Sequence, residues 1–204
     1  MYDFTLTEEI ARWAFEVGCS SLSNWHISFT NPTAGPWKTI KAKDANGEEG
    51  EVYRFELEEK RPDIILLNDE LQLVIIIEAK DSLNKLTARN QVEKSVQVVF
   101  DLAHKLQGLH GNRYWRPHCE YPIIMGLLWG AERPTTANER NVVFDAYRNE
   151  ALHYSGFYNN FILGIETTRV GNALNCRICG KGYRRQCVFS LEEIAQSFNL
   201  PLLE

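Results

Sequence analysis

RPDIILLNDELQLVIIIEAKD, residues 61–81, contains two apolar segments separated by a short polar one. Segments 63–67 and 71–79 are rich in Ile, Leu and Val, which predicts an antiparallel hairpin. The consecutive β-branched residues 74–77 indicate a strand that is buried on both faces, at the centre of a sheet. Charged residues stand at both ends of this apolar hairpin, although an unpaired buried charge costs several kcal/mol. They therefore suggest a functional site.

The charged residues of this hairpin are of the types that hold a metal ion. Side chains two apart on a strand share a face, so Glu78 and Lys80 should project the same way. Asp63, at the start of the neighbouring strand, can approach them from across the hairpin. Two adjacent carboxylates repel each other unless a cation lies between them, and oxygen ligands suit a hard divalent ion such as Mg²⁺. A nearby lysine adds a group that can hold a phosphate oxygen or orient a water, as phosphodiester hydrolysis requires.

Whether the two acids meet depends on where the hairpin turns. A turn centred on Asn68-Asp69 would pair Asp63 with Val74, roughly 13 Å along the strand from Glu78. That separation is too large for one ion. The carboxylates can share a site only if the turn lies nearer Glu70-Leu71, or if the strand bends at Asp63. The alternative is a surface hairpin in which Lys80 forms an ordinary salt bridge, of little energetic value, with one of the two acids.

The rest of the chain alternates helical and strand patterns, which predicts one α/β domain over residues 1–204, with a central mixed sheet flanked by helices. Segment 20–50 is rich in turn formers and aromatic residues, and is expected to be irregular or a loose hairpin. The predicted helices are 5–19, 84–106, 138–147 and 191–198, and the further predicted strands are 51–57, 121–129 and 158–167.

Composition limits the function classes. The chain has 204 residues, 44% of them hydrophobic, and a formal net charge of −5, which argues against coating nucleic acid by bulk electrostatics. Its longest apolar runs are far shorter than the ~20 residues that span a bilayer. No secretory signal pattern is visible at the N-terminus, and five cysteines suit reduced thiols better than a disulfide framework. We therefore expect a soluble cytoplasmic protein without a membrane partner.

Pro62-Asp63, followed by Glu78-Ala79-Lys80, closely resembles the signature of the PD-(D/E)xK nuclease superfamily. The resemblance implies a restriction-endonuclease-like core. It also implies one or two Mg²⁺ ions per active site, held by Asp63, Glu78 and the backbone carbonyl of Ala79, with Lys80 as the catalytic lysine. Members of the superfamily often add an acid from the first helix. Glu9 would be its match here, with Glu8 the lesser choice.

Among members of this superfamily, a type II restriction endonuclease is the closest resemblance. RecB-like members carry a Gln followed four residues later by a Tyr, whereas Gln91 is followed by Ser95. Cutting both strands of double-stranded DNA calls for two active sites, which implies a homodimer on a palindromic site. A structure-specific repair or recombination nuclease, such as a junction resolvase, is the alternative. Candidate DNA contacts are Lys85, Arg89, Gln91, Lys94, Arg113 and Arg116.

A second candidate metal site lies near the C-terminus. Cys176-x-x-Cys179-Gly resembles one knuckle of a zinc ribbon, and Cys187 offers a third thiolate. The second cysteine pair of a zinc ribbon is missing, so unligated thiols remain the alternative. With zinc, residues 170–190 would form a small appendage. The non-enzymatic hypothesis is then a zinc-stabilised module that binds DNA without cutting it.

Overall fold

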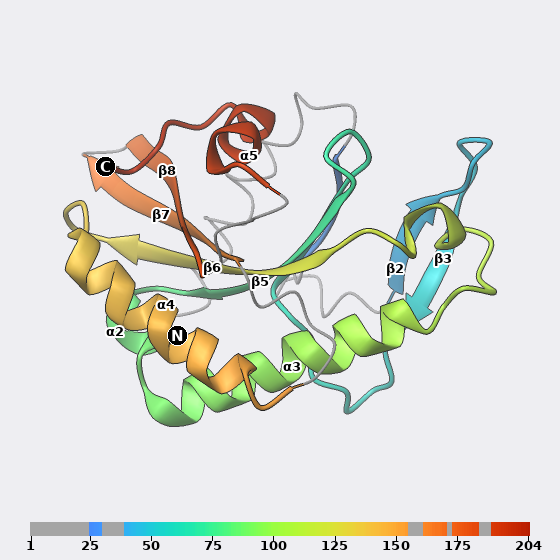
Figure 1. Ribbon diagram of the computed structural model, residues 1–204, viewed down its shortest axis with the longest axis horizontal. Helices are drawn as coiled ribbons and strands as arrows, with labels where there is room; N and C mark the ends of the chain where they lie inside the picture. Colours follow the sequence, from blue (N-terminus) through green and yellow to red (C-terminus); the bar gives the residue numbers. More distant parts are fainter. Residues whose placement is uncertain (1–24, 30–38, 155–160, 171–172, 184–188) are drawn as a thin grey trace.

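The computed structural model describes residues 25–29, 39–154, 161–170, 173–183 and 189–204. Their main feature is a six-stranded mixed sheet with strand order β1-β4-β5-β6-β7-β8 (Figure 1). The prediction of an α/β protein with a central mixed sheet is confirmed. The strands of this sheet are β1 (Trp25–Phe29), β4 (Ile64–Asn68), β5 (Leu73–Lys80), β6 (Ile123–Ala131), β7 (Phe161–Val170) and β8 (Ala173–Gly182).

Strand direction divides the sheet into three parts. β1, β4 and β5 form an antiparallel meander, β5, β6 and β7 run parallel, and β8 returns antiparallel to β7. The parallel step from β5 to β6 needs a long crossover, which α2 (Leu83–Leu86) and α3 (Arg89–Gln107) supply. The predicted helix 84–106 is therefore interrupted after its first turn.

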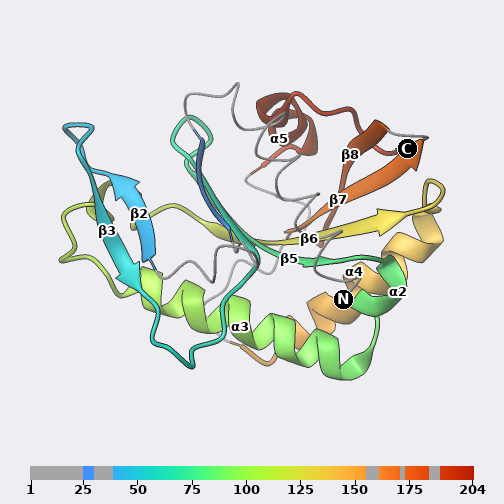
Figure 2. The ribbon, with the colours of Figure 1, turned by 180° about the vertical axis from the view of Figure 1, so that it is seen from behind.

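Helices cover both faces of the sheet. α2, α3 and α4 (Ala137–Ala151) lie on one face, whereas α5 (Leu191–Phe198) lies on the other, beside β8 (Figures 1 and 2). Two apolar cores result, because alternate residues of each strand enter opposite faces. In β5, Val74 and Ile76 pack on the side of α3 and α4, and Ile75 and Ile77 pack on the side of α5. The prediction that β5 is central and buried on both faces is confirmed.

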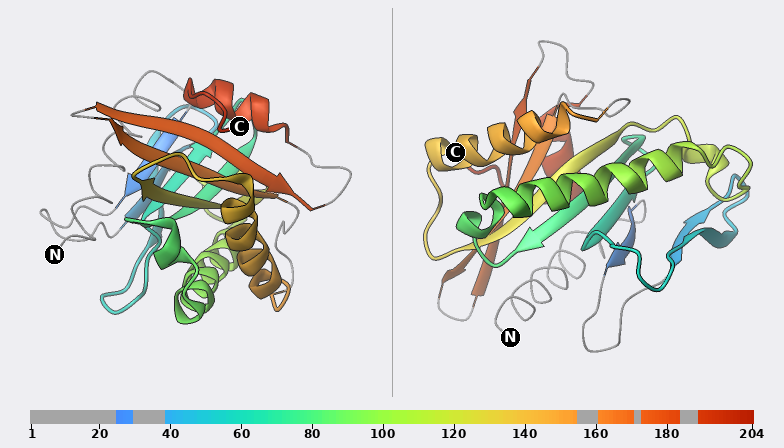
Figure 3. Two further views of the ribbon diagram at one scale, coloured as in Figure 1. Left: turned by 90° about the vertical axis from the view of Figure 1, so that its left-hand side faces the viewer. Right: turned by 90° about the horizontal axis from the view of Figure 1, so that it is seen from below.

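A separate two-stranded sheet lies beside the C-terminal end of α3. It consists of β2 (Thr39–Lys43) and β3 (Glu49–Arg54) (Figure 3). The prediction of a strand over 51–57 was wrong in its bounds, because β3 ends at Arg54 and Leu57 is 86% exposed. The first strand of the meander is instead β1, within the segment expected to be irregular. Its pairing with β4 is a long-range contact that no local sequence pattern predicts.

Cys176 and Cys179 lie within the main sheet rather than in an appendage. Cys176 and Cys179 both belong to β8, and each is buried. They enter opposite cores, with Cys176 on the side of α5 and Cys179 on the side of α4. One zinc ion cannot reach both thiols across the sheet, so the predicted Cys176–Cys179 zinc knuckle is corrected. Cys187 lies outside the described residues, as does the predicted helix 5–19 with Glu8 and Glu9.

Two smaller findings complete the fold. α5 begins with a capping box, in which the Ser190 side chain accepts a hydrogen bond from the backbone N–H of Glu193 at 3.1 Å. Across the described ranges, every helix is too short or too polar to cross a membrane.

Candidate active site

The register of the β4–β5 hairpin brings Asp63 alongside Glu78. Ile64 pairs with Ile77, and the backbone N–H of Asp63 donates to the Ile77 carbonyl at 3.1 Å. The turn spans residues 69–72, because Asn68 pairs with Leu73. It is therefore centred between Glu70 and Leu71, which is one of the two arrangements that allow the acids to meet. The wide turn is stabilised by the Asn68 side chain, which accepts a hydrogen bond from the N–H of Leu71 at 2.7 Å.

All three charged residues of the motif lie on the face covered by α3 and α4. Asp63 has the strand parity of Ile65, and Glu78 and Lys80 have that of Ile76. The backbone N–H of Ala79 donates to Asp63 Oδ2 at 2.7 Å, which fixes this carboxylate against β5. Asp63 and Lys80 are partly exposed, whereas Glu78 is buried.

Lys80 lies within direct reach of Glu78. Its Nζ donates to Glu78 Oε1 at 2.9 Å and to the Ala79 carbonyl at 3.0 Å. No other described residue donates a hydrogen bond to the remaining oxygens, Asp63 Oδ1 and Glu78 Oε2. Among the described residues, each acid thus has one oxygen that accepts a hydrogen bond and one that accepts none.

Burial and the negative charge of Glu78 together raise the pKa of Asp63 to about 7, against the opposing effects of Lys80, the Ala79 N–H and Lys94. Burial and the repulsion between the two carboxylates therefore oppose full ionisation of Asp63 at neutral pH. A cation placed between the two acids would relieve this repulsion. The electrostatics thus favour an ion beside Asp63 Oδ1 and Glu78 Oε2.

Gln91 contacts the site itself, although the sequence suggested a DNA contact. Its Nε2 donates to Glu78 Oε1 at 3.2 Å and to Ser95 Oγ at 2.6 Å, one turn further along α3. Ser95 is buried, and Tyr147 of α4 is fully buried in the core shared by the two helices. Burial raises the pKa of Tyr147, and the charge of Glu78 adds to the effect. Sequence reasoning missed Ser95 and Tyr147 as neighbours of the site, because each occupies a position in a helical apolar stripe.

We expect Gln91→Leu to lower the turnover number of the activity proposed below by ~10–100-fold, the usual cost of removing an outer-sphere partner of a metal ligand. The reason is that, of its two donors among the described residues, Glu78 Oε1 would keep Lys80 alone and lose its fixed orientation. Steady-state kinetics measure this effect, with KM changing little. Gln97→Leu, at an exposed position on the same helix, is the matched control. Equal turnover in both variants would contradict the positioning role.

The other candidate DNA contacts fall into two groups at opposite ends of the sheet. Lys85, Arg89 and Lys94 are exposed on α2 and α3, beyond Lys80. Arg113 and Arg116 are exposed in the loop that leads into β6, and the pairing of Val74 with Ile123 fixes that loop about 20 Å along the strand from Lys80. Three of these residues have acidic partners: Lys85 with Asp81, Arg89 with Glu93, and Arg113 with both Asp44 and Glu48.

Comparisons with protein-family models, with curated proteins and with solved structures find no significant match.

Proposed function

We propose that this protein is a Mg²⁺-dependent endonuclease of the PD-(D/E)xK type that hydrolyses DNA phosphodiester bonds. The observation that carries this proposal is the convergence of Asp63, Glu78 and Lys80 on one face of the sheet, where β4 begins and β5 ends. Three charged groups in a largely apolar hairpin cost folding free energy. Such an arrangement is typical of a site selected for chemistry rather than for stability.

The order of elements supports a restriction-endonuclease-like core. β1, β4 and β5 form the antiparallel meander, α3 follows, and β6 joins β5 in parallel. The sequence resemblance calls for this order of three strands, helix and strand. The β2–β3 hairpin is then an insertion between the first two strands of the meander.

The chemistry of the ligand atoms suits Mg²⁺. Asp63 Oδ1 and Glu78 Oε2 are hard carboxylate oxygens, and the raised pKa of Asp63 supports a cation between the two acids. The Ala79 carbonyl, a third candidate ligand, accepts a hydrogen bond from Lys80. When bound, Mg²⁺ would activate a water and neutralise charge that develops on the phosphate.

Lys80 contributes a positive charge next to the two acids. Its amino group donates to Glu78 Oε1 at 2.9 Å, so the protein supplies a positive charge where a phosphate oxygen or a water would bind. Gln91 and the Ala79 N–H hold the two carboxylates in place for this task. The protein's part is therefore to orient groups that the chemistry needs at fixed positions.

Double-stranded DNA is the proposed substrate and a type II restriction enzyme the proposed class. Exposed Lys85, Arg89 and Lys94 follow Lys80 on α2 and α3, where they can contact phosphates next to the scissile bond. The hydroxyl of Ser95 accepts from Gln91 in the place where RecB-like members carry a tyrosine, which favours the restriction class over RecB-like exonucleases. A twofold dimer would supply one active site for each strand.

Digestion of a large unmodified viral DNA with Mg²⁺, and with EDTA instead, tests this function. Discrete Mg²⁺-dependent fragments are the expected result. Cutting of branched or flapped DNA alone would change the class to a repair or recombination nuclease. Absence of cutting on every substrate, with DNA binding retained, would replace the nuclease by a DNA-binding module.

A further inference from the structure

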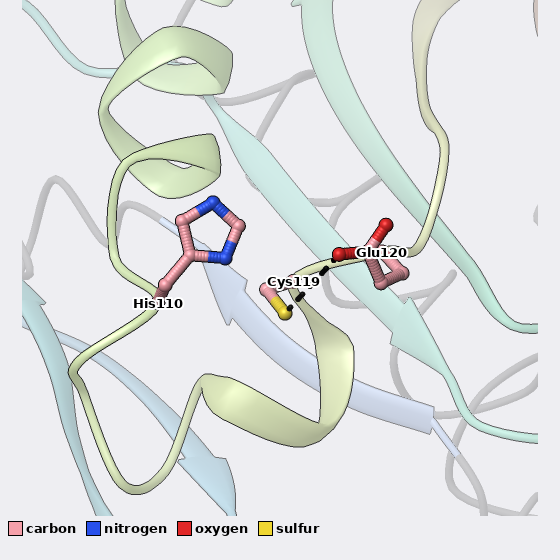
Figure 4. A group of neighbouring side chains, drawn as sticks. All are labelled: His110, Cys119 and Glu120. Carbon is pink, nitrogen blue, oxygen red and sulfur yellow. Dashed lines mark hydrogen bonds between the residues drawn. The ribbon is translucent and has the colours of Figure 1, made fainter.

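A second set of metal-ligating side chains lies in the loop between α3 and β6. His110, Cys119 and Glu120 each offer one ligand atom, and these atoms all lie within 4.8 Å of one another. Figure 4 shows His110 approaching from the start of the loop and the other two from its end, after the 3-10 helix η2 (Arg116–His118). From this cluster we infer a zinc site that is separate from the nuclease centre.

The ligand types select the ion. An imidazole nitrogen, a thiolate sulfur and a carboxylate oxygen together suit Zn²⁺, whereas Mg²⁺ and Ca²⁺ take oxygen ligands alone. Zinc bond lengths of ~2.0–2.3 Å imply ligand atoms about 3.5 Å apart in a tetrahedron. Cys119 Sγ lies 4.0 Å from Glu120 Oε1, and all three ligand atoms lie within 4.8 Å of one another, so side-chain rotations of about 1 Å bring them to that spacing. Three protein ligands leave the fourth position to a water.

The backbone that carries these ligands is already fixed by hydrogen bonds. The side chain of Asn112 accepts from the N–H groups of Tyr114 and Trp115 and donates to carbonyls of β3. Trp115 and His118 are buried, and His118 Nε2 lies 2.9 Å from Asp69 Oδ1. A preformed loop loses little entropy when an ion binds, so three ligands suffice for a specific site.

Position separates this site from Asp63 and Glu78. The loop enters β6 at the end where Val74 pairs with Ile123, about 20 Å along the sheet from Lys80. The same loop also holds the β2–β3 hairpin, through ion pairs of Arg113 with Asp44 and Glu48. Zinc would therefore join the two ends of this loop and stabilise its contact with the hairpin. Binding releases the thiol proton of Cys119 as the sulfur–zinc bond forms.

Titration of the metal-free full-length chain with Co²⁺ tests the inference, since a cobalt–thiolate bond gives a charge-transfer band. We expect saturable binding of one Co²⁺ per chain at this site, displacement by Zn²⁺, and loss of the band in Cys119→Ser. His110→Ala and Glu120→Gln should each weaken binding by at least about tenfold, because losing an outer-sphere partner alone costs ~10–100-fold. His104→Ala, at an exposed histidine of α3, is the matched control.

A band that survives in Cys119→Ser, or one that is lost in Cys187→Ser instead, would overturn the inference. So would the absence of saturable binding in the unchanged chain. Thermal unfolding gives a second readout that does not depend on the cysteine variant. Zn²⁺ should raise the Tm of the unchanged chain more than that of His110→Ala, because a weaker site stabilises the fold less at the same Zn²⁺ concentration. An equal rise in both would contradict the site.

Discussion

Lys80→Ala should lower the rate of DNA cleavage by ~10²–10⁴-fold, the range typical for removal of a charge-stabilising or proton-transferring group. Lys80 is the cation within hydrogen-bond distance of Glu78, and its amino group lies at the end of β5 beside both acids. Without it, neither the water nor the phosphate would meet a positive charge supplied by the protein at that position. The loss should appear in single-turnover cleavage at saturating enzyme.

A DNA-binding measurement distinguishes a loss of the chemical step from a loss of substrate binding. In Ca²⁺, the Lys80→Ala variant should bind DNA within a few-fold of the unchanged protein, because Lys85, Arg89 and Lys94 remain exposed on α2 and α3. Lys43→Ala removes an exposed lysine of β2 and is the matched control for a general loss of positive charge. Cleavage by Lys80→Ala at the rate of this control would remove Lys80 from the active site.

Asp63→Asn should abolish Mg²⁺-dependent cleavage and at the same time stabilise the protein at alkaline pH. The folded-state pKa of Asp63 is about 7, above its ordinary value of 3.8, because of burial and the charge of Glu78. The folded protein thus holds this proton more tightly than the unfolded chain does. The stabilisation it provides is complete below pH 3.8 and is lost as the pH rises through 7. Asparagine has no proton to lose, so it removes this dependence.

Thermal unfolding in EDTA measures the effect. The Tm of the unchanged protein should fall by about 2–4 °C more than that of Asp63→Asn between pH 6 and pH 8. Asp101→Asn, at an exposed aspartate of α3, should keep the full pH dependence. At pH 8, Mg²⁺ should raise the Tm of the unchanged protein and not that of Asp63→Asn. A parallel pH dependence in all three proteins would contradict the raised pKa.

Much of the site follows from the chemistry of a short hairpin. Alternation along β5 was sufficient to predict that Glu78 and Lys80 share a face, and the buried run before them predicted a central strand. The meeting of Asp63 with Glu78 required one further fact, the centre of the turn. The sequence allowed two positions, since Asn68 and Asp69 are turn formers as good as the residues that follow them. The hydrogen bond from Leu71 to the Asn68 side chain decides between them.

Features that depend on tertiary contacts could not be predicted. β1 pairs with β4 across a long sequence separation, and local turn formers around it conceal the strand. Cys176 and Cys179 have the spacing of a zinc knuckle. In an extended strand, however, residues that are three positions apart point to opposite faces, and so do these two thiols. Spacing specifies a metal site only once the backbone conformation is known.

Contacts between side chains on different helices, strands and loops could not be predicted from the sequence either. Gln91 reaches Glu78 because the start of α3 packs over the end of β5, a contact that neither segment encodes alone. The cluster of His110, Cys119 and Glu120 could not be predicted for the same reason, since the loop must fold back before His110 meets the other two residues.

A crystal structure of the protein grown with Mn²⁺, with anomalous data for that ion, tests the central claim most directly. We predict at least one anomalous peak between the carboxylates of Asp63 and Glu78, at the ~2.0–2.6 Å distances typical of hard ions, with Asp63 Oδ1 and Glu78 Oε2 as ligands. The peak should be absent in Asp63→Asn. Full Mn²⁺-supported cleavage without any ion between these two side chains would contradict the account.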